Sequence, residues 1–286
     1  MSIAFLHEPY NDTDQISAFD LGVTHGDGVF ETLLAVKNDH EVNILQLEDH
    51  LSRLQKSLTS LDLQLNGDIM VAAHSALSDE IVAHPEETEF VLRFFVTAGL
   101  EKDNRTQPLA WVTANPRPEA SKAASQQGVN VQLLSKGHPA DFASHSPWAL
   151  QSTKSTSYAT AMATLRFVQK NGFDEAIYTT AEGYILEGPT SNVVFRQGKT
   201  LYTPEPELGL LHGTTQRSIY RAAKADGYQL KYGQYKVEDL INADGAWLTS
   251  SVRLFTPILS IDKKPVANLD ETHAFHDTMK RWILKN

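Results

Sequence analysis

The sequence predicts a mixed α/β protein made of two domains, and three observations support this prediction. Helical and strand-like patterns of apolar residues follow one another along the whole chain. With 286 residues, the chain can bury one large core or two modest ones. A polar stretch punctuated by two prolines, residues 115–127, interrupts these patterns and is the expected interdomain linker.

The first strand and helix are marked by glycine and leucine patterns. Gly26 and Gly28 mark a tight turn or bulge, and strand-like alternation begins at Val29. Residues 44–61 form a predicted helix, because leucines recur there at three- and four-residue steps and make one apolar stripe (Leu47, Leu51, Leu54, Leu58 and Leu61). Arg53 lies at the edge of that stripe, where its side chain is either partly buried or extended to water.

One helix and two strands complete the first domain. Residues 67–84 form the predicted helix, which Pro85 ends. Residues 90–97 and 109–114 are the predicted strands. Arg93 lies inside the first of these apolar runs. Because an unpaired buried charge is costly, we expect Arg93 to pair with a carboxylate or to face a cavity.

The second half has its own set of elements. In order they are a strand (128–134), a helix (159–170), a strand (175–180), a hairpin (196–198), a helix between Gly213 and Gly227, and a strand from Ala246 into a hydroxyl-rich turn. Gly213, Thr214 and Thr215 open the second of these helices. Free N–H groups and hydroxyls at such a start can hold a phosphate, although taken alone the pattern is more often an ordinary helix cap.

Composition and charge narrow the classes of function. The apolar and charged fractions are those of an ordinary globular protein. The 25 basic and 35 acidic residues leave a net charge of −10, which argues against a general nucleic-acid or anionic-membrane surface. Any anionic ligand must therefore be held by a local pocket, and we expect neither nucleic acid nor membrane among the partners.

The absence of cysteine excludes disulfides, thiolate nucleophiles, zinc–thiolate sites and iron–sulfur clusters. His273 and His276 are spaced for one helix face, but the other nine histidines are scattered and the sequence fixes no acidic partner, so no metal site is expected. The first residues lack the basic segment and apolar core of a signal peptide, and no apolar run approaches the length of a membrane span. We therefore expect a cytoplasmic enzyme.

Lys154 is the strongest candidate for a chemical role. It lies among small hydroxyl residues, in Ser152-Thr-Lys-Ser-Thr-Ser-Tyr158, just ahead of the helix predicted from residue 159. Helix N-termini disfavour cations, which helps to keep an amine neutral and nucleophilic. A lone lysine is far more often a solvated surface residue, so the case depends on the residues that accompany it.

Those companions suggest one cofactor. A nucleophilic lysine can form an imine with an aldehyde, and the carboxylate of Glu187 can hold a proton on a pyridine nitrogen. Two hydroxyl-rich turns and an arginine can hold a phosphate. Together these groups meet the needs of pyridoxal phosphate.

The chain also resembles the class IV, or fold type IV, family of pyridoxal-phosphate enzymes. That family contains branched-chain aminotransferases, D-amino-acid aminotransferases and 4-amino-4-deoxychorismate lyases. The resemblance extends from Asp20 to about Ser260, and six motifs occur in the family's order. They are Gly26-Asp-Gly-Val-Phe-Glu-Thr, His50-Leu-Ser-Arg-Leu, Lys154-Ser-Thr-Ser-Tyr, Gly183-Tyr-Ile-Leu-Glu-Gly-Pro-Thr-Ser-Asn, Gly213-Thr-Thr-Gln-Arg and Thr249-Ser-Ser-Val-Arg.

The resemblance implies a role for each matching residue. Lys154 forms a Schiff base with the cofactor and, once released, moves protons at the substrate carbon. Glu187 keeps the pyridine nitrogen protonated, Tyr158 bonds the phenolic oxygen of the ring, and Asn192 supports the ring. The phosphate is held by side chains and backbone amides from several segments (Arg53, Gly213, Thr214, Thr215 and Ser251).

The resemblance leaves the reaction open, and we expect the lyase, which releases pyruvate and leaves 4-aminobenzoate for folate. The tyrosine four residues after Lys154 and the Thr249-Ser-Ser-Val-Arg253 turn are lyase-like, and Arg253 there can face a substrate carboxylate. The Arg-Gly and Pro-Arg-x-His patterns of D-amino-acid enzymes are missing. Against this, Arg93 lies where branched-chain enzymes carry a carboxylate-binding arginine, and Phe30 suits several subfamilies. An amino-acid transaminase is the alternative, and a non-catalytic cofactor-binding homologue is a remote one.

The resemblance implies two α/β domains with the cofactor between them. We expect a small domain over residues 1–114, the linker 115–127, and a large cofactor-binding domain over residues 128–286. Members of the family generally work as homodimers, so a second copy of this chain and a small amino substrate are the expected partners.

Overall fold

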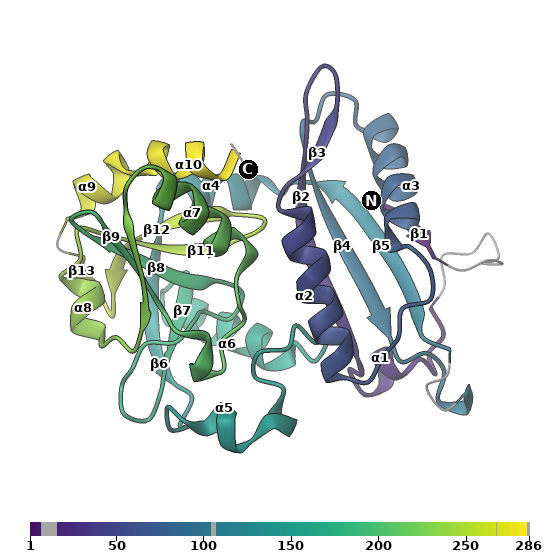
Figure 1. The fold of residues 1–286 in the computed structure, drawn as a ribbon, viewed down its shortest axis with the longest axis horizontal. Coiled ribbons are helices and arrows are strands. Elements are labelled where there is room, and N and C mark those ends of the chain that lie inside the picture. Colours follow the sequence, from purple (N-terminus) through teal and green to yellow (C-terminus); the bar gives the residue numbers. More distant parts are fainter. Residues whose placement is uncertain (7–15, 104–106, 267, 285–286) are drawn as a thin grey trace. The chain divides into compact units, whose positions relative to one another are not determined.

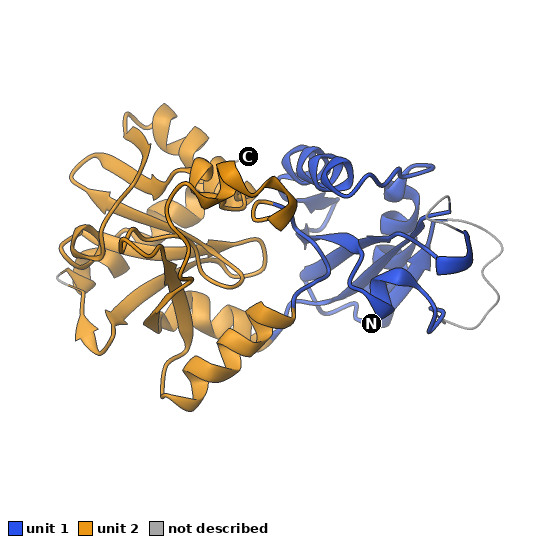
Figure 2. Cartoon of the chain, turned by 90° about the horizontal axis from the view of Figure 1, so that it is seen from below, with its two compact units in different colours: residues 1–118, 153–158 blue, residues 119–152, 159–286 orange. Residues whose placement is uncertain are grey.

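The computed structural model describes residues 1–6, 16–103, 107–266 and 268–284. The chain forms two compact units (Figure 2). Unit 1 contains Met1–Pro118 together with Thr153–Tyr158, and unit 2 contains Glu119–Ser152 together with Ala159–Asn286. The segment that carries Lys154 thus belongs to unit 1. The domains expected from the sequence were continuous stretches, which would have placed this segment in the second domain.

Unit 1 is an antiparallel sheet with helices on one face (Figure 1). Its five strands lie in the order β1 (Ser2–Phe5), β5 (Leu109–Pro116), β4 (Glu89–Thr97), β2 (Gly28–Lys37) and β3 (Val42–Ile44). The helical elements are α1 (Leu21–Thr24), α2 (Leu47–Ser60), α3 (Ile69–Ala83) and the short 3-10 helix η1 (Glu101–Asp103). The helices and strands predicted for this half are therefore confirmed, with small shifts at their ends.

The two faces of this sheet differ in chemistry. Leu33, Leu92 and Ala114 lie in one row across β2, β4 and β5 and are fully buried on the face that α2 and α3 cover. In another row, nearer the start of β2 and on the other face, Phe30 pairs with Phe95, which pairs with Trp111. These rings stack in sequence, with centroids 6.0 Å apart for the first pair and 5.0 Å for the second. Alternation of side chains along each strand produces this separation of an aliphatic face from an aromatic one.

Unit 2 is built on a mixed sheet of eight strands. The strands are β10 (Gln229–Gly233), β9 (Thr200–Pro204), β8 (Asn192–Gln197), β11 (Gly245–Ser250), β12 (Leu254–Ile261), β6 (Val129–Ser135) and β7 (Glu175–Thr179), with β13 (Lys264–Pro265) paired to β12. The β9–β10, β6–β12 and β6–β7 pairs are parallel and the others antiparallel. Buried apolar side chains of these strands, such as Val193, Leu248 and Ile258, form the core.

Helices and turns of unit 2 connect these strands. They are α4 (Glu119–Gln127), α5 (Phe142–His145), η2 (Pro147–Ala149), α6 (Ala159–Lys170), η3 (Pro206–Leu208), α7 (Thr214–Ala225), α8 (Val237–Ile241), α9 (Leu269–Ala274) and α10 (His276–Leu284). The helix predicted over residues 159–170 is confirmed. Residues 119–127, expected in the linker, form α4, where Ser125 donates a hydrogen bond to the carbonyl of Phe255 in β12.

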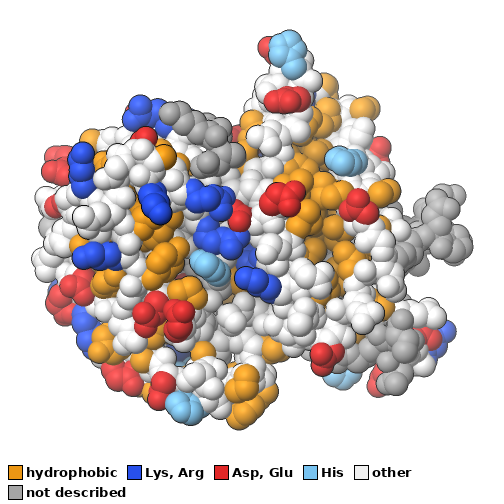
Figure 3. Space-filling model, viewed as in Figure 1, with side chains coloured by type: hydrophobic (Ala, Val, Ile, Leu, Met, Phe, Trp, Pro, Cys, Tyr) orange, Lys and Arg blue, Asp and Glu red, His pale blue; other side chains and the backbone are white. Residues whose placement is uncertain are grey.

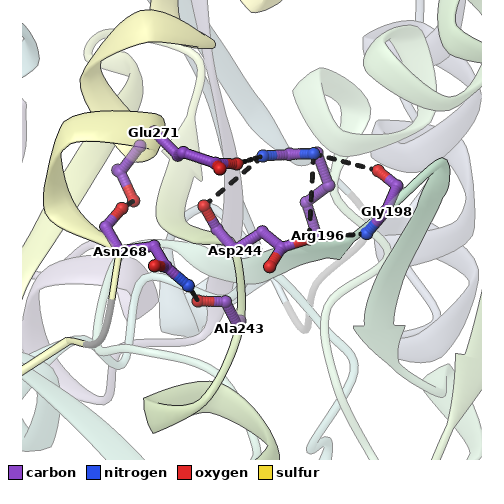
Figure 4. A network of polar contacts seen from close by, with 7 residues as sticks. Arg196, Gly198, Ala243, Asp244, Asn268 and Glu271 are labelled. Atoms are coloured by element: carbon purple, nitrogen blue, oxygen red, sulfur yellow. Dashed lines mark hydrogen bonds and ion pairs between the residues drawn. The ribbon is translucent and has the colours of Figure 1, made fainter.

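A polar network secures the predicted hairpin between β8 and β9 (Figure 4). Arg196 donates to Glu271 of α9 at 2.6 Å and to the carbonyl of Gly198 at 3.0 Å. The backbone N–H of Gly198 donates to Asp244 at 2.7 Å. One arginine thereby joins the hairpin, the start of β11 and α9, elements far apart in the sequence.

Across the described ranges, no helix is long and apolar enough to cross a membrane.

Candidate active site

The Lys154 segment is held against the Gly26–Gly28 turn by its backbone. The N–H of Phe30 donates to the carbonyl of Lys154 at 3.0 Å, and the N–H of Thr156 donates to the carbonyl of Gly28 at 2.8 Å. Glycine leaves room for the lysine segment at position 26 and for the neighbouring strand β4 at position 28. A β-carbon at Gly26, where φ is +69°, would lie 2.5 Å from Oγ of Ser157, and one at Gly28 would lie 2.8 Å from the carbonyl oxygen of Val96.

The side chain of Lys154 lies beside aromatic rings of unit 1. Its Nζ is 4.4 Å from the ring centroid of Phe30 and 5.8 Å from that of Tyr158. The two rings meet edge to face, with centroids 5.2 Å apart. The sequence suggested that a helix N-terminus governs this amine. Within unit 1 the amine lies beside ring faces, which attract a cation and provide an apolar wall, while the helix that follows in the sequence, α6, belongs to unit 2.

A buried ion-pair cluster lies between β2 and α2. Arg53 donates to both carboxylate oxygens of Glu31, from Nε and from Nη2, each at 2.7 Å. Nδ1 of His50 lies 2.8 Å from the same Oε2. Burial raises the pKa of Glu31, but the charge of Arg53 and the hydrogen bonds from Arg53 and His50 outweigh it and lower that pKa to about 2. Glu31 is therefore an anion at neutral pH, and Arg53 is buried rather than extended to water.

Arg93 lies on the aromatic face of the same sheet. It pairs with Thr32 and Thr113 in a row near the aromatic row, and its Nη1 donates to Oδ1 of Asn115 at 2.9 Å. Burial lowers the pKa of Arg93. The sequence left open whether a carboxylate or a cavity faces this arginine. In the described part of the chain its partner is an amide, so its charge is not neutralised by an acidic side chain.

Glu187 of unit 2 is held by two N–H donors. Its Oε2 accepts from Nδ2 of Asn192 at 3.1 Å and from the backbone N–H of Leu211 at 3.2 Å. The same Nδ2 also donates to the carbonyl of Leu211 at 2.8 Å. Glu187, Asn192, Leu211 and His212 line one pocket. Asn192, expected from the sequence to have a supporting role, thus directly orients the glutamate.

The start of α7 adjoins this pocket. A β-carbon at Gly213 would lie only 2.0 Å from Oδ1 of Asn192, so only glycine fits where the helix begins. Thr214 and Thr215 are buried in the first turn, and Oγ1 of Thr215 has no hydrogen-bond partner among the described residues. An unpartnered buried hydroxyl beside the N–H groups of a helix start is a ready anion ligand.

Basic residues continue along α7. Arg217, Arg221 and Lys224 recur at four- and three-residue steps, and Figure 3 shows Lys and Arg side chains gathered over this part of unit 2. Such a local concentration favours an anionic ligand on a protein whose net charge is −10.

The turn after β11 carries the last group of predicted residues. Thr249 pairs with Asn192 across β11 and β8, and its buried Oγ1 has no partner in the described ranges. Ser251 follows in the turn. Arg253 bonds to Glu175 of β7 and donates to Oγ1 of Thr190 at 3.2 Å. The arginine expected to face a substrate carboxylate thus already has a carboxylate partner in its own unit.

The described residues fit pyridoxal phosphate. Unit 1 supplies an amine beside ring faces, and unit 2 supplies an oriented carboxylate. The unpartnered hydroxyl of Thr215, at the Gly213 turn, matches the phosphate. Two residues that the sequence analysis did not single out, Glu31 and His50, belong to quoted motifs. Two features of the sequence could have indicated them: Glu31 is an acidic residue inside an apolar strand, and His50 lies three residues before Arg53, on the same helix face.

Comparison with known proteins gives consistent results. The family model described as amino-transferase class IV matches residues 28–261. A protein of Mycobacterium tuberculosis named bifunctional aminodeoxychorismate lyase / D-amino acid transaminase is 35% identical over 280 residues, covering 95% of this chain and 94% of that protein. An aminodeoxychorismate lyase of Bacillus subtilis is 29% identical over 258 residues, covering 87% of this chain and 82% of that protein.

Solved structures agree with these relatives. The PLP-bound form of a hypothetical aminotransferase from Mycobacterium tuberculosis has a TM-score of 0.88 at 31% identity, covering 100% of this chain and 99% of that one. A fold IV-transaminase from Curtobacterium pusillum has a TM-score of 0.87 at 30% identity, again covering 100% and 99%. The predicted family, its two-domain fold type and its cofactor are confirmed. The chain belongs to the amino-transferase class IV family, the pyridoxal-phosphate-dependent enzymes of fold type IV.

Proposed function

We propose that this enzyme is a 4-amino-4-deoxychorismate lyase, which releases pyruvate and leaves 4-aminobenzoate. The observation that carries the proposal is the 35% identity, along 95% of the chain, to a relative whose name begins with this activity. The relative from Bacillus subtilis bears the same name without a transaminase activity.

We propose that residues of both units hold the cofactor. Lys154 binds its aldehyde carbon covalently, and Tyr158 donates to the phenolic oxygen. Thr214, Thr215, Ser251, Arg53 and the N–H groups of the Gly213 turn hold the phosphate. When bound, pyridoxal phosphate supplies an electron-poor ring that accepts the electron pair left when a proton is removed from the substrate α-carbon.

Lys154 and Glu187 carry the proton chemistry in this proposal. Once the substrate amine has replaced it on the cofactor, the released amine of Lys154, next to the Phe30 ring, would take the proton from the substrate α-carbon. Glu187 keeps a proton on the pyridine nitrogen, and this needs a carboxylate whose charge and direction are constant. The donors from Asn192 and Leu211 provide both, because hydrogen bonds to a carboxylate stabilise its charged form.

Three residues are proposed to face the substrate. Arg93, held by Asn115, supplies a cation for a carboxylate, and Phe30 supplies a planar surface for an unsaturated ring. Arg253 is the third, and its guanidinium also bonds to Glu175. A ring-bearing dicarboxylate substrate makes more use of a cation beside an aromatic row than an aliphatic amino acid does.

The second candidate function is an amino-acid transaminase. It is favoured by the second half of the Mycobacterium tuberculosis relative's name, D-amino acid transaminase, and by relatives named branched-chain-amino-acid aminotransferases at about one quarter identity (25% for the Methanocaldococcus jannaschii protein). Both activities share the proton step at Lys154 and differ in the bond changes that come after it.

We also propose that the enzyme works as a homodimer. Exposed apolar side chains of unit 2 support this, among them Phe167 of α6 at 52% exposure and Trp148 of η2 at 77%. Light scattering on the purified enzyme measures the mass directly, and a monomer at micromolar concentration would contradict the proposal.

An absorbance experiment separates the two functions. The purified holoenzyme is given D-alanine, L-leucine or L-glutamate singly, and then the lyase substrate made in place from chorismate and glutamine by an aminodeoxychorismate synthase. For a lyase, 4-aminobenzoate and pyruvate appear, and the amino acids leave the band of the lysine-bound cofactor unchanged. Loss of that band with an amino acid, without aminobenzoate, identifies a transaminase and overturns the first proposal.

A further inference from the structure

The cluster formed by Glu31, His50 and Arg53 contains two side chains to which the proposed function assigns no role. Glu31 and His50 are 0% and 1% exposed, and Arg53 is 9% exposed. Burying a carboxylate with a guanidinium is costly unless the geometry is close to ideal. Here the pairing is bidentate, with both nitrogen-to-oxygen distances at 2.7 Å. This planar two-bond contact fixes the direction of the guanidinium as well as its position.

His50 adds a second restraint on the same carboxylate. Burial lowers the pKa of His50 although Glu31 opposes this, so the imidazole is neutral at neutral pH. A neutral imidazole can bond a carboxylate only by donating, so Nδ1 carries the hydrogen toward Oε2 of Glu31 at 2.8 Å. Oε2 therefore receives one bond from His50 and one from Arg53, and the Glu31 side chain cannot rotate without breaking both.

The cluster shares its framework with Lys154. On β2, the backbone of Phe30 bonds to the backbone of Lys154 and the next residue, Glu31, bonds to Arg53. On α2, Ser57 lies one turn beyond Arg53, and its Oγ accepts from the N–H of Lys154 at 3.4 Å. One strand and one helix of unit 1 therefore set both the lysine and the arginine.

We propose that Glu31 and His50 are positioning residues, which hold the Arg53 guanidinium in the direction that binds the cofactor phosphate. This inference rests on the proposed phosphate role of Arg53. Because the negative charge of Glu31 cancels the positive charge of Arg53, the guanidinium would bind the phosphate through hydrogen bonds of fixed direction rather than through net charge. The ion pair uses Nε and Nη2 of the guanidinium.

The proposal can be tested by the direction in which the affinity for an anion changes when the charge of Glu31 is removed. If Glu31 only neutralised Arg53, then Glu31→Gln would leave an extra positive charge and tighten the binding of an anion. If Glu31 positions Arg53, the same substitution weakens that binding, because the guanidinium loses its fixed direction. The two hypotheses predict opposite changes from one variant.

The experiment compares pyridoxal phosphate with pyridoxal, which lacks the phosphate. Each is titrated into the full-length enzyme after removal of its cofactor. The dissociation constant of pyridoxal divided by that of pyridoxal phosphate reports the phosphate contacts alone. For Glu31→Gln and Glu31→Asp we expect this ratio to fall about tenfold or more, as is typical when a supporting hydrogen bond is lost. The aspartate variant keeps the negative charge, but its shorter side chain cannot reach both Nε and Nη2 of Arg53. If the glutamine variant fails to fold, the aspartate variant is used in its place.

Two further substitutions and one control complete the design. His50→Asn keeps a donor near the position of Nδ1 and should retain most of the ratio, whereas His50→Leu should lower it. The control is Glu89→Gln, which removes the partner of Arg117, another largely buried arginine of unit 1, at 3.1 Å. It should leave the ratio unchanged, since that ion pair has no proposed contact with the cofactor.

Arg53→Gln separates the two levels of the proposal. If Arg53→Gln lowers the ratio but both Glu31 variants leave it unchanged or raise it, the positioning role is wrong while the phosphate role stands. If Arg53→Gln leaves the ratio unchanged, Arg53 does not bind the phosphate, and the positioning role of Glu31 and His50 is then wrong as well. Competition by inorganic phosphate against pyridoxal phosphate should weaken in the same variants and provides a readout independent of the aldehyde.

Discussion

Lys154 in unit 1 and Glu187 in unit 2 are both placed with the help of glycine-containing turns, but by different means. Lys154 is placed through its backbone, which bonds to β2, while its amine lies beside the rings of Phe30 and Tyr158. Glu187 is placed through its carboxylate, which accepts bonds from Asn192 and Leu211. In the proposed function Lys154 exchanges its bonding partners and Glu187 keeps its charge, so the first is held at the main chain and the second at its carboxylate.

Removing the amine should have the largest effect. Lys154→Ala deletes the group proposed to bind the cofactor aldehyde and to move the α-proton. We expect at least roughly a thousandfold loss of activity and no band of lysine-bound cofactor in the spectrum. Persistence of that band in the variant would show that the covalent anchor lies elsewhere.

Neutralising the carboxylate should come next. Glu187→Gln keeps the size of the side chain but cannot hold a proton on the pyridine nitrogen. We expect activity to fall about a hundredfold or more, in the range of a lost charge-stabilising contact, while the band of lysine-bound cofactor remains. Loss of cofactor binding together with activity would instead assign Glu187 a role in affinity.

A smaller effect should follow from crowding the lysine segment. A β-carbon at Gly26 would lie 2.5 Å from Oγ and 3.3 Å from Cα of Ser157, so Gly26→Ala should break the bond from the Ser157 hydroxyl to the Gly26 carbonyl and shift residues 153–158 by a few tenths of an ångström. Gly172→Ala is the matched control, because Gly172 has a similar φ of +81° but no atom within 4 Å of the added carbon. Both variants should lose about 1 kcal/mol from backbone strain, and only Gly26→Ala should lose activity, by about tenfold. Thermal unfolding and steady-state rates test this.

The last prediction concerns stability rather than activity, and it links pH to the Glu31 cluster. The pKa of Glu31 is lowered from its ordinary value of 4.5 to about 2 in the folded chain. Above about pH 4.5 the carboxylate is charged in both folded and unfolded chains, and its stabilising contribution is complete. As pH falls toward about 2, the unfolded chain binds the proton first, so up to roughly 3 kcal/mol of stability is lost.

Denaturant unfolding across that pH range provides the test. The difference in unfolding free energy between the natural chain and Glu31→Gln should be largest above about pH 5 and should shrink as the solution is acidified. A difference that stays constant with pH would show that the ion pair does not control this titration.

The sequence alone determined the family and the cofactor. Leucine spacing predicted α2, the hydroxyl-rich start predicted α7, and six ordered motifs predicted the family and its cofactor. These features are local, because helix formation and capping depend on residues a few positions apart, and motif order is a property of the chain itself.

The tertiary structure decided which side chains pair. Arg53, Arg93 and Arg253 look alike in the sequence, yet one meets Glu31, one meets Asn115 and one meets Glu175. The grouping of residues 153–158 with unit 1 was equally invisible, because it depends on glycines more than a hundred residues earlier. Ion pairs and close backbone contacts form between strands and helices that folding brings together, so their partners follow from sheet register and packing rather than from spacing along the chain.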